Sequence, residues 1–143
     1  MDLSIIIVNW NTRDLLAECL ASLPAATEGL STEILVVDNA SHDGSDGMVA
    51  EAFPQVRFIA ADRNLGFSRA NNLALKLATG DGLLLLNPDT KLPQTALADM
   101  LTYMDAHPEM GVAGPRLVQQ DGSLDKACRR SFPSPMVSFY HIV

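Results

Sequence analysis

The sequence predicts an α/β fold in which helices flank a mainly parallel sheet, and three observations support this prediction. Short apolar runs recur along the chain, segments with helical periodicity separate them, and polar loops follow several of the runs. Strands that alternate with helices favour parallel pairing, with the helices on both faces of the sheet. We therefore expect one α/β domain over residues 1–143.

The first half of the chain contains two such units. Leu3–Val8 is a β-branched run that predicts a strand, and Glu33–Asp38 predicts a second one. A helix is expected from Arg13, with Asn11 or Thr12 as its N-cap and Pro24 beyond its end. Its predicted inward residues are Leu15, Leu16, Cys19, Leu20 and Leu23. A shorter helix is expected over Asp46–Ala52.

The pattern continues through the middle of the chain. Val56–Ala60 predicts a third strand, and Phe67–Thr79 predicts a helix that ends at Gly80 in a C′ position. Its predicted inward residues are Ala70, Leu73, Ala74, Leu77 and Ala78. Leu83–Leu86 is a continuous apolar run, which suits a strand buried on both faces.

The last part of the chain predicts less structure. Pro93 suits the first turn of a helix that ends near His107. A short strand is expected at Gly111–Gly114 and a turn at 120–123. The sequence stops on the apolar run Met136–Val143. This ending suggests either the front half of a longer protein or a segment that packs on a partner.

Composition limits the possible functions. Apolar residues make up 48% of the 143 residues and charged residues 19%, which is typical of soluble globular proteins. No apolar run approaches the length of a membrane span, and the start lacks the basic region of a signal peptide, so we expect a cytoplasmic protein. A formal charge of −7 disfavours binding to nucleic acid or to anionic membranes. Cys19 and Cys128 form no zinc pattern and are interpreted as free thiols.

Several nucleotide and hydrolase motifs are absent. Asn9–Thr12 occupies the place where a dinucleotide-binding fold has Gly-x-Gly-x-x-Gly. No Gly-Lys-Ser/Thr sequence follows a strand, and Gly-x-Ser-x-Gly does not occur. Polar loops nevertheless follow three expected strands, and ligands collect at the carboxyl ends of strands in open α/β sheets. From these residues alone, Asn87-Pro88-Asp89 is equally well interpreted as a simple turn or as part of a site.

Four motifs occur in order along most of the chain: Ser4–Asn11, Val36–Ser45, Asn64–Asn72 and Leu85–Asp89. Together they resemble the family 2 glycosyltransferases of the GT-A fold, and most closely their rhamnosyltransferase-like branch of polysaccharide assembly. The resemblance implies an inverting enzyme, or its donor-binding half, that transfers a sugar from a nucleoside diphosphate sugar, linked to UDP or dTDP. The implied acceptor is a saccharide or a lipid-linked molecule, so peripheral contact with the inner face of the membrane is compatible with it.

The resemblance also assigns roles to residues. Asp38 matches the aspartate that contacts base and ribose, with capping of its own loop as the alternative. Asn39 and Asp43-Gly44-Ser45 shape the same loop, with an ordinary structural turn as the alternative. Asn9, Trp10 and Asn11 match the segment that lines the base pocket. Trp10 could instead be ordinary core.

A second group matches the surroundings of the diphosphate. Asn64, Gly66 and Asn71 correspond to the family's asparagine-glycine signature, where Gly66 would allow close approach of the backbone. Arg63, Arg69, Arg129 and Arg130 are cations that either contact phosphate or acceptor or remain on the surface.

The resemblance implies a divalent metal as cofactor. Asp89 corresponds to the last aspartate of the family's Asp-x-Asp motif, and Asn87 replaces the first. Mg²⁺ or Mn²⁺ can be held by one carboxylate together with phosphate oxygens of the substrate. The resemblance implies that the general base belongs to an acceptor half, which follows residue 143. The alternative function is a sugar-nucleotide-binding module without catalysis.

Overall fold

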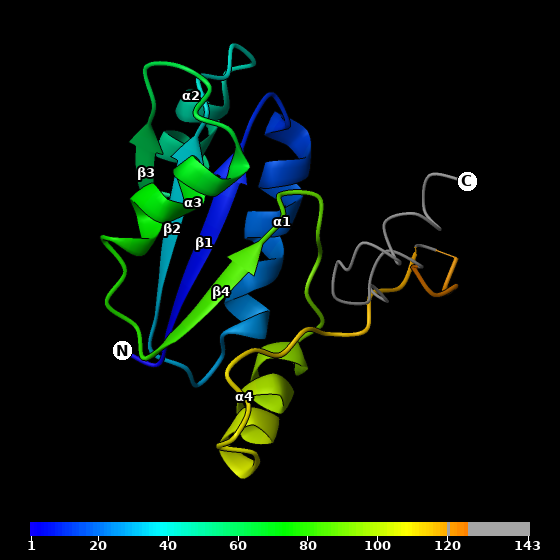
Figure 1. The fold of residues 1–143 in the computed structure, drawn as a ribbon. Coiled ribbons are helices and arrows are strands. Elements are labelled where there is room, and N and C mark those ends of the chain that lie inside the picture. The colour runs from blue at the N-terminus through cyan, green and yellow to red at the C-terminus, as the bar shows by residue number, and fades with distance from the viewer. Residues whose placement is uncertain (120, 126–143) are drawn as a thin grey trace, which may run out of the picture. The chain divides into compact units, whose positions relative to one another are not determined.

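The protein is built on a four-stranded parallel sheet. A computed structural model describes residues 1–119 and 121–125. Its strands are β1 (Leu3–Asn9), β2 (Thr32–Asp38), β3 (Arg57–Ala60) and β4 (Gly82–Leu86). They lie in the order β3-β2-β1-β4, and every pair is parallel (Figure 1). The predicted parallel α/β sheet is confirmed.

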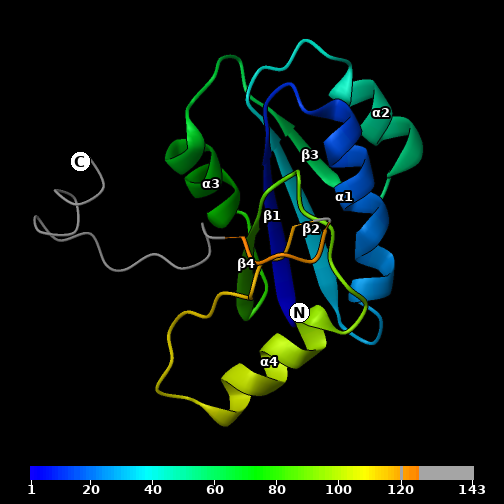
Figure 2. The ribbon, with the colours of Figure 1, turned by 90° about the vertical axis from the view of Figure 1, so that its right-hand side faces the viewer.

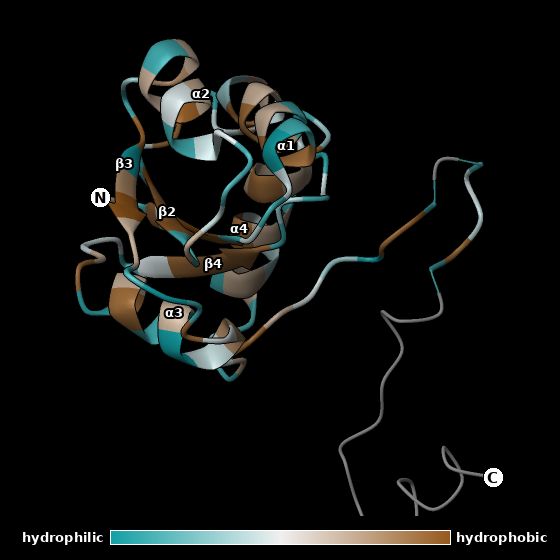
Figure 3. Cartoon of the chain, turned by 90° about the horizontal axis from the view of Figure 1, so that it is seen from above, coloured by the Kyte–Doolittle hydropathy of each residue, from teal (hydrophilic) through white to brown (hydrophobic). Residues whose placement is uncertain are grey.

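Helices cover both faces of this sheet. α1 (Arg13–Ala26) and α2 (Ser45–Ala52) lie on one face, and α3 (Phe67–Leu75) lies on the other (Figures 2 and 3). Each helix connects two parallel strands, as the alternation in the sequence requires. The polar loops that follow β1, β2 and β4 are thereby brought to one edge of the sheet (Figure 1).

Two apolar cores hold the layers together. Alternate residues of the central strands point to opposite faces, so Ile5 and Ile7 belong to one core and Ile6 to the other. The α1 side is the larger core and includes the α1 residues Leu16, Cys19, Leu20, Leu23 and Ala26. The α3 side is smaller and is closed by Ala70 and Ala74.

Strand β4 is buried on one face rather than two, which corrects the sequence prediction. Leu84 and Leu86 belong to the α1-side core, whereas Leu83 and Leu85 are 53% and 50% exposed. In the register, Leu85 pairs with Ile6, so both side chains point toward the face that carries α3. Because α3 packs over β1 and β2, that face of β4 is left uncovered by the described helices.

Two predictions about α1 are also wrong in detail. Pro24 lies inside the helix, in its last turn, and the helix continues to Ala26. Leu15 is 45% exposed, since the buried stripe runs through Leu16, Cys19, Leu20 and Leu23 instead. Packing of this stripe against the sheet outweighs the backbone hydrogen bond that proline removes.

Helix α3 is shorter than expected and ends at Leu75. Gly80 is therefore not its C′ residue and does not have a positive φ. A Cβ atom on Gly80 would lie 2.5 Å from the backbone nitrogen of Ser4 and 2.7 Å from the carbonyl carbon of Leu3. The glycine is needed for close approach to β1.

We expect Gly80→Ala to lower the free energy of unfolding by about 2 kcal/mol, because β1 is a central strand and must shift to admit the methyl group. Urea unfolding measures this loss. Gly111→Ala is a matched control, since nothing lies within 4 Å of a Cβ there. Equal stability of both variants would contradict the close-approach role of Gly80.

A polar cluster beside Gly80 ties the amino-terminal ends of the strands together. The Ser4 hydroxyl donates to Glu33 Oε1 at 2.6 Å, and Glu33 Oε1 also accepts from the amide and hydroxyl of Thr79, at 2.6 and 2.7 Å. Hydrogen bonds from Ser4 and then from Thr79 hold the pKa of Glu33 below its ordinary value of 4.5.

This lowered pKa predicts a loss of stability in acid. The ionised form of Glu33 is favoured in the folded state, so its contribution is complete above pH 4.5 and is lost as the pH falls through the folded pKa. Melting temperatures measured across this range should fall less steeply with acid for Glu33→Gln than for the wild type. Parallel pH profiles would contradict this role of Glu33.

The described residues divide into two compact units, between Leu101 and Thr102. The boundary falls within α4 (Ala96–Ala106), which begins three residues after Pro93, so Pro93 is not in its first turn. The strand predicted at Gly111–Gly114 is not formed. Instead, Val118 and Leu124 make an isolated antiparallel bridge around the predicted turn.

Among the described residues, no helix combines the length and the apolar character that a membrane span requires.

Candidate functional site

The carboxyl ends of three strands lie level with one another. Asn9, Asp38 and Ala60 are in register at the ends of β1, β2 and β3, and β4 ends beside Ile7. The loops that follow these strands form the candidate site at this edge of the sheet (Figure 1). The sequence prediction that these loops converge is confirmed.

Asn9 lies beneath this edge, at the centre of a buried polar network. Its side chain is fully buried, and Nδ2 donates to Asp38 Oδ1 at 2.7 Å. Nδ2 also lies 3.2 Å from Ser41 Oγ and 3.0 Å from Ser45 Oγ, and the Thr12 hydroxyl donates to Asn9 Oδ1 at 2.6 Å. Both polar atoms of the Asn9 side chain thus have partners within the protein. Asn9 therefore connects the loop that follows β1 to the loop that follows β2.

Asp38 is held by two donors. Besides Asn9, the backbone amide of Ser41 donates to its Oδ2 at 2.8 Å, which is the loop-capping role considered for this residue. The side chain is 6% exposed. A carboxylate has further lone pairs, so these contacts leave capacity to accept a hydrogen bond from a ligand.

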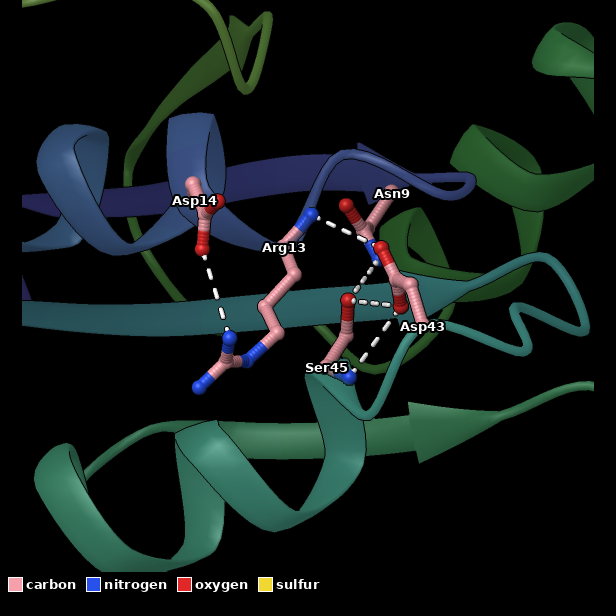
Figure 4. Close-up of polar contacts among 5 residues, drawn as sticks. All are labelled: Asn9, Arg13, Asp14, Asp43 and Ser45. Atoms are coloured by element: carbon pink, nitrogen blue, oxygen red, sulfur yellow. Dashed lines mark hydrogen bonds and ion pairs between the residues drawn. The ribbon is translucent and has the colours of Figure 1, made fainter.

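Asp43 joins the amino-terminal ends of two helices (Figure 4). Its Oδ2 accepts from the backbone amide of Arg13, the first residue of α1, at 2.8 Å. Its Oδ1 accepts from the hydroxyl and the amide of Ser45, the first residue of α2. Burial raises the pKa of Asp43, but the hydrogen bonds from Ser45 and Arg13 outweigh burial and hold the pKa below 3.8.

We expect Asp43→Ala to destabilise the protein by about 2 kcal/mol, because it removes the cap of two helices at once. Thr12 cannot compensate, since it makes no side-chain cap for α1. Urea unfolding of this variant and of Asp46→Ala provides the test. Asp46 is an exposed acid in the first turn of α2, so its loss changes the charge at that helix end without removing the bridge. Equal effects of the two substitutions would refute the capping role.

Asn11 ties the β1 loop to the β2 loop. Asn11 has a positive φ of 53°, its amide donates to Ser41 Oγ at 2.9 Å, and its Oδ1 accepts from the His42 amide at 2.8 Å. These contacts hold the backbone around Trp10, whose side chain is 56% exposed. Trp10 is therefore not a core residue, and its ring is accessible to a ligand.

The loop before α3 is fixed by two asparagines. Asn39 Oδ1 accepts from the Leu65 amide at 3.0 Å, and Asn64 Oδ1 accepts from the Gly66 amide at 2.8 Å. Gly66 has φ 75° and ψ 168°, a conformation that is essentially restricted to glycine. A Cβ on Gly66 would meet nothing within 4 Å, so the backbone here is open to an approaching group.

Asn71 lies in the next turn of α3 and is 4% exposed. Its Nδ2 donates to the Phe67 carbonyl of its own helix at 2.9 Å. Asn71 therefore contacts its own helix in this structure, whereas Asn64, Gly66 and Arg69 are exposed. Arg63 is exposed as well. Arg129 and Arg130 lie outside the described residues.

The loop after β4 presents Asp89 to solvent. Asn87 and Asp89 are exposed, and the carboxylate of Asp89 has no hydrogen bond or ion pair with the described residues. The thiol of Cys19 lies 3.7 Å from the Asn87 carbonyl oxygen. Burial, together with the charge of Asp89, raises the pKa of this thiol to about 11, so Cys19 stays protonated at neutral pH.

A shallow pocket lies at the start of α1. It has a volume of about 370 Å³ and is lined by Asn11, Thr12, Arg13, Asp14, Leu15 and Asp43. Among the described residues proposed for nucleotide binding, Asn11 alone lines it. The ion pair between Arg13 and Asp14 is long, at 3.4 Å, and exposed. The candidate site is therefore the open edge of the sheet rather than this pocket.

The donor atoms for a cation are few. Within residues 1–119 and 121–125, no group of three or more His, Cys, Asp or Glu side chains could hold a metal ion. Asp89 is an accessible carboxylate at the site edge, and carboxylate oxygen is a ligand that Mg²⁺ and Mn²⁺ prefer. This donor fits a metal only if a substrate supplies several of the other ligands.

Comparison with known proteins identifies the family. The family model described as Glycosyl transferase family 2 matches residues 4–140. The chain belongs to this family. The predicted glycosyltransferase identity is therefore confirmed.

Two curated members of the family are similar to this chain. The succinoglycan biosynthesis protein ExoO of Rhizobium meliloti is 32% identical over 106 residues, which cover 73% of this chain and 30% of ExoO. The N-acetylglucosaminyl-diphospho-decaprenol L-rhamnosyltransferase of Mycobacterium tuberculosis is 28% identical over 99% of this chain and 49% of its own length. The chain thus spans between about a third and a half of these relatives.

Solved structures of glycosyltransferases confirm the GT-A fold. TarS of S. aureus in complex with UDP has a TM-score of 0.68 and 26% identity, over 76% of this chain and 33% of that chain. Mannosyltransferase PcManGT from Pyrobaculum calidifontis, in complex with GDP-Man and Mn²⁺, has a TM-score of 0.63 and 26% identity, over 71% of this chain and 32% of that chain.

The structure gives specific contacts to the Asp43-Gly44-Ser45 segment, which the resemblance assigns to shaping its loop. Ser45 belongs to the network around Asn9, and Asp43 joins two helices. Ser41 also belongs to this network but was given no role from the sequence. A hydroxyl residue that closely follows a strand-end aspartate was the available signal.

Proposed function

We propose that this chain is the donor-binding part of an inverting glycosyltransferase, with a nucleoside diphosphate sugar bound at the carboxyl edge of the sheet. The proposal is supported by four features that share this edge. They are the exposed Trp10 ring, the Asp38 loop, the open backbone at Gly66 and the free carboxylate of Asp89. In open α/β sheets this edge is the usual place for a nucleotide.

Different residues would contact the base, the ribose and the diphosphate of the donor. Trp10 offers an aromatic face for the base, and Asp38 offers acceptor oxygens for a ribose hydroxyl. The diphosphate would lie near Gly66, where the amino terminus of α3 favours an anion. Arg69, in the first turn of α3, adds a positive charge. UDP, UDP-GlcNAc and GDP-Man complexes of similar structures support a donor of this class.

Asp89 would hold a divalent cation together with the donor's phosphate oxygens, and Asn87 would lie beside it. When bound, Mg²⁺ or Mn²⁺ stabilises the negative charge that develops on a departing nucleoside diphosphate. The Mn²⁺ complex of PcManGT supports a metal in this role. The chain carries a net charge of −7, so a cation would also reduce repulsion of the diphosphate.

The acceptor is proposed to be a saccharide or a lipid-linked saccharide in polysaccharide synthesis. The names of the rhamnosyltransferase and of ExoO support this class of reaction. An inverting transfer needs a general base for the acceptor hydroxyl. We assign this role to no described residue and propose that the base belongs to the acceptor half.

Isothermal calorimetry of the chain with UDP, dTDP and GDP, each with and without MnCl₂, tests the proposal. We expect one of these nucleotides to bind, and to bind more tightly with manganese. Absence of heat with every nucleotide, from protein that is folded by circular dichroism, would overturn it. Binding without any transfer or hydrolysis of the matching sugar nucleotide would favour the non-catalytic module.

A further inference from the structure

The segment that carries Asp89 is attached to the side of α1. It runs from Asn87 to Leu92 and passes alongside the helix (Figures 1 and 2). Three contacts hold it there, and they lie on both sides of Asp89 in the sequence. Cys19 Sγ lies 3.7 Å from the Asn87 carbonyl oxygen, the Leu92 amide donates to Ser22 Oγ at 3.2 Å, and Lys91 Nζ lies 2.9 Å from Glu18 Oε2.

These contacts differ in how firmly they fix the segment. Lys91 and Glu18 have side chains that are 63% and 56% exposed, and such pairs contribute little. The Cys19 thiol is a weak donor at a long distance. The hydrogen bond from the Leu92 amide to Ser22 Oγ is therefore the contact that fixes the direction of the segment.

The orientation of the Ser22 hydroxyl is fixed by its own helix. Its hydrogen is donated to the Cys19 carbonyl oxygen at 2.7 Å, which leaves its lone pairs for the Leu92 amide. Ser22 and Leu92 are half-buried, so water can replace this hydrogen bond only in part. The Leu92 side chain also packs against the α1-side core, but this apolar contact does not fix the direction of its amide.

We propose that Ser22 is a positioning residue for the cation and diphosphate site, which acts by holding the chain three residues after Asp89. This inference rests on the proposed function. Loss of the hydroxyl would release Leu92 and allow the Asp89 carboxylate to sample several orientations. A bound cation would then have to order the loop, and its affinity would fall.

The test compares Ser22→Ala with two matched variants. Ser22→Thr keeps a hydroxyl at the same place and should rescue the effect. Thr27→Ala removes a hydroxyl that also donates to a carbonyl of α1, Leu23 at 2.9 Å, but does not contact the Asp89 segment. The measured quantities are the affinity for UDP with and without MnCl₂ and the hydrogen exchange rate of the Leu92 amide.

We expect Ser22→Ala to reduce the manganese-dependent gain in UDP affinity about fivefold, the effect of one lost hydrogen bond of ordinary strength. UDP binding without manganese should not change, and the Leu92 amide should exchange faster. Ser22→Thr and Thr27→Ala should resemble the wild type in all three measurements.

Two results would overturn the inference in different ways. If the wild type gains UDP affinity from manganese and Ser22→Ala gains as much, Ser22 has no positioning role although the proposed function stands. If the wild type binds UDP no better with manganese, the metal part of the proposed function fails, and the role of Ser22 fails with it.

Discussion

Asp89→Ala should remove the manganese-dependent part of nucleotide binding while the protein remains folded. The carboxylate is exposed and has no hydrogen bond or ion pair with the described residues, so the fold does not depend on it. As a direct ligand, it should contribute at least as much as residues that only orient ligands, whose loss weakens metal binding roughly 10- to 100-fold. Calorimetry with UDP and MnCl₂ measures the loss, and binding without metal is expected to persist.

Two further variants separate charge from local structure. Asp89→Asn keeps a residue suited to the turn closed by the Thr90 amide and the Asn87 carbonyl, but it removes the charge and should lose the metal dependence as well. Asp81→Ala removes an exposed aspartate just before the opposite end of β4 and should have no effect. Unfolding of Asp89→Ala, with normal metal dependence in Asp89→Asn, would show that this residue is only a turn former.

Asn9→Leu should be the most destabilising of the substitutions considered. Leucine has a similar volume but cannot donate to Asp38, so a nearly buried carboxylate loses a donor at 2.7 Å. Leaving a buried charged acceptor without its donor costs about 3 kcal/mol, and the Thr12 hydroxyl also loses its acceptor. Urea unfolding provides the measurement. Asn72→Leu, at an exposed position on α3, is the control.

Asn9→Asp gives this prediction a pH signature. The new carboxylate would face Asp38 across the same short contact, and two like charges at this distance repel each other in the folded state. The penalty is therefore present at neutral pH and is relieved in acid, where the repulsion between carboxylates is lost. A loss of stability that is independent of pH would contradict the contact of residue 9 with the Asp38 carboxylate.

The strands and the site edge were predictable because their signals are local. The β-branched and leucine-rich runs ended at polar residues, and each of those ends became a strand end in the parallel sheet. Alternation with helical segments then placed the ends together. Trp10, Asp38, Gly66 and Asp89 lie in the motifs at or after these strand ends, and the resemblance to the family assigns them their expected roles.

The errors concern features that depend on distant parts of the chain. Leu83 and Leu85 are exposed because α3 covers other strands, which an apolar run cannot reveal. Gly80 ends no helix but meets the backbone of β1, some 76 residues earlier. The partners of Asn9 and the attachment of the Asp89 segment at Ser22 are likewise contacts between separate elements.

The central claim is that a nucleoside diphosphate and its cation bind at the carboxyl edge of the sheet. Paramagnetic broadening of backbone amide signals by Mn²⁺ in the presence of UDP tests it most directly. We expect broadening around Asp89, Gly66 and Trp10, and none around Thr32 and Gly82 at the opposite ends of β2 and β4. Broadening centred on that opposite edge, or no site-specific broadening in protein that binds UDP, would contradict the claim.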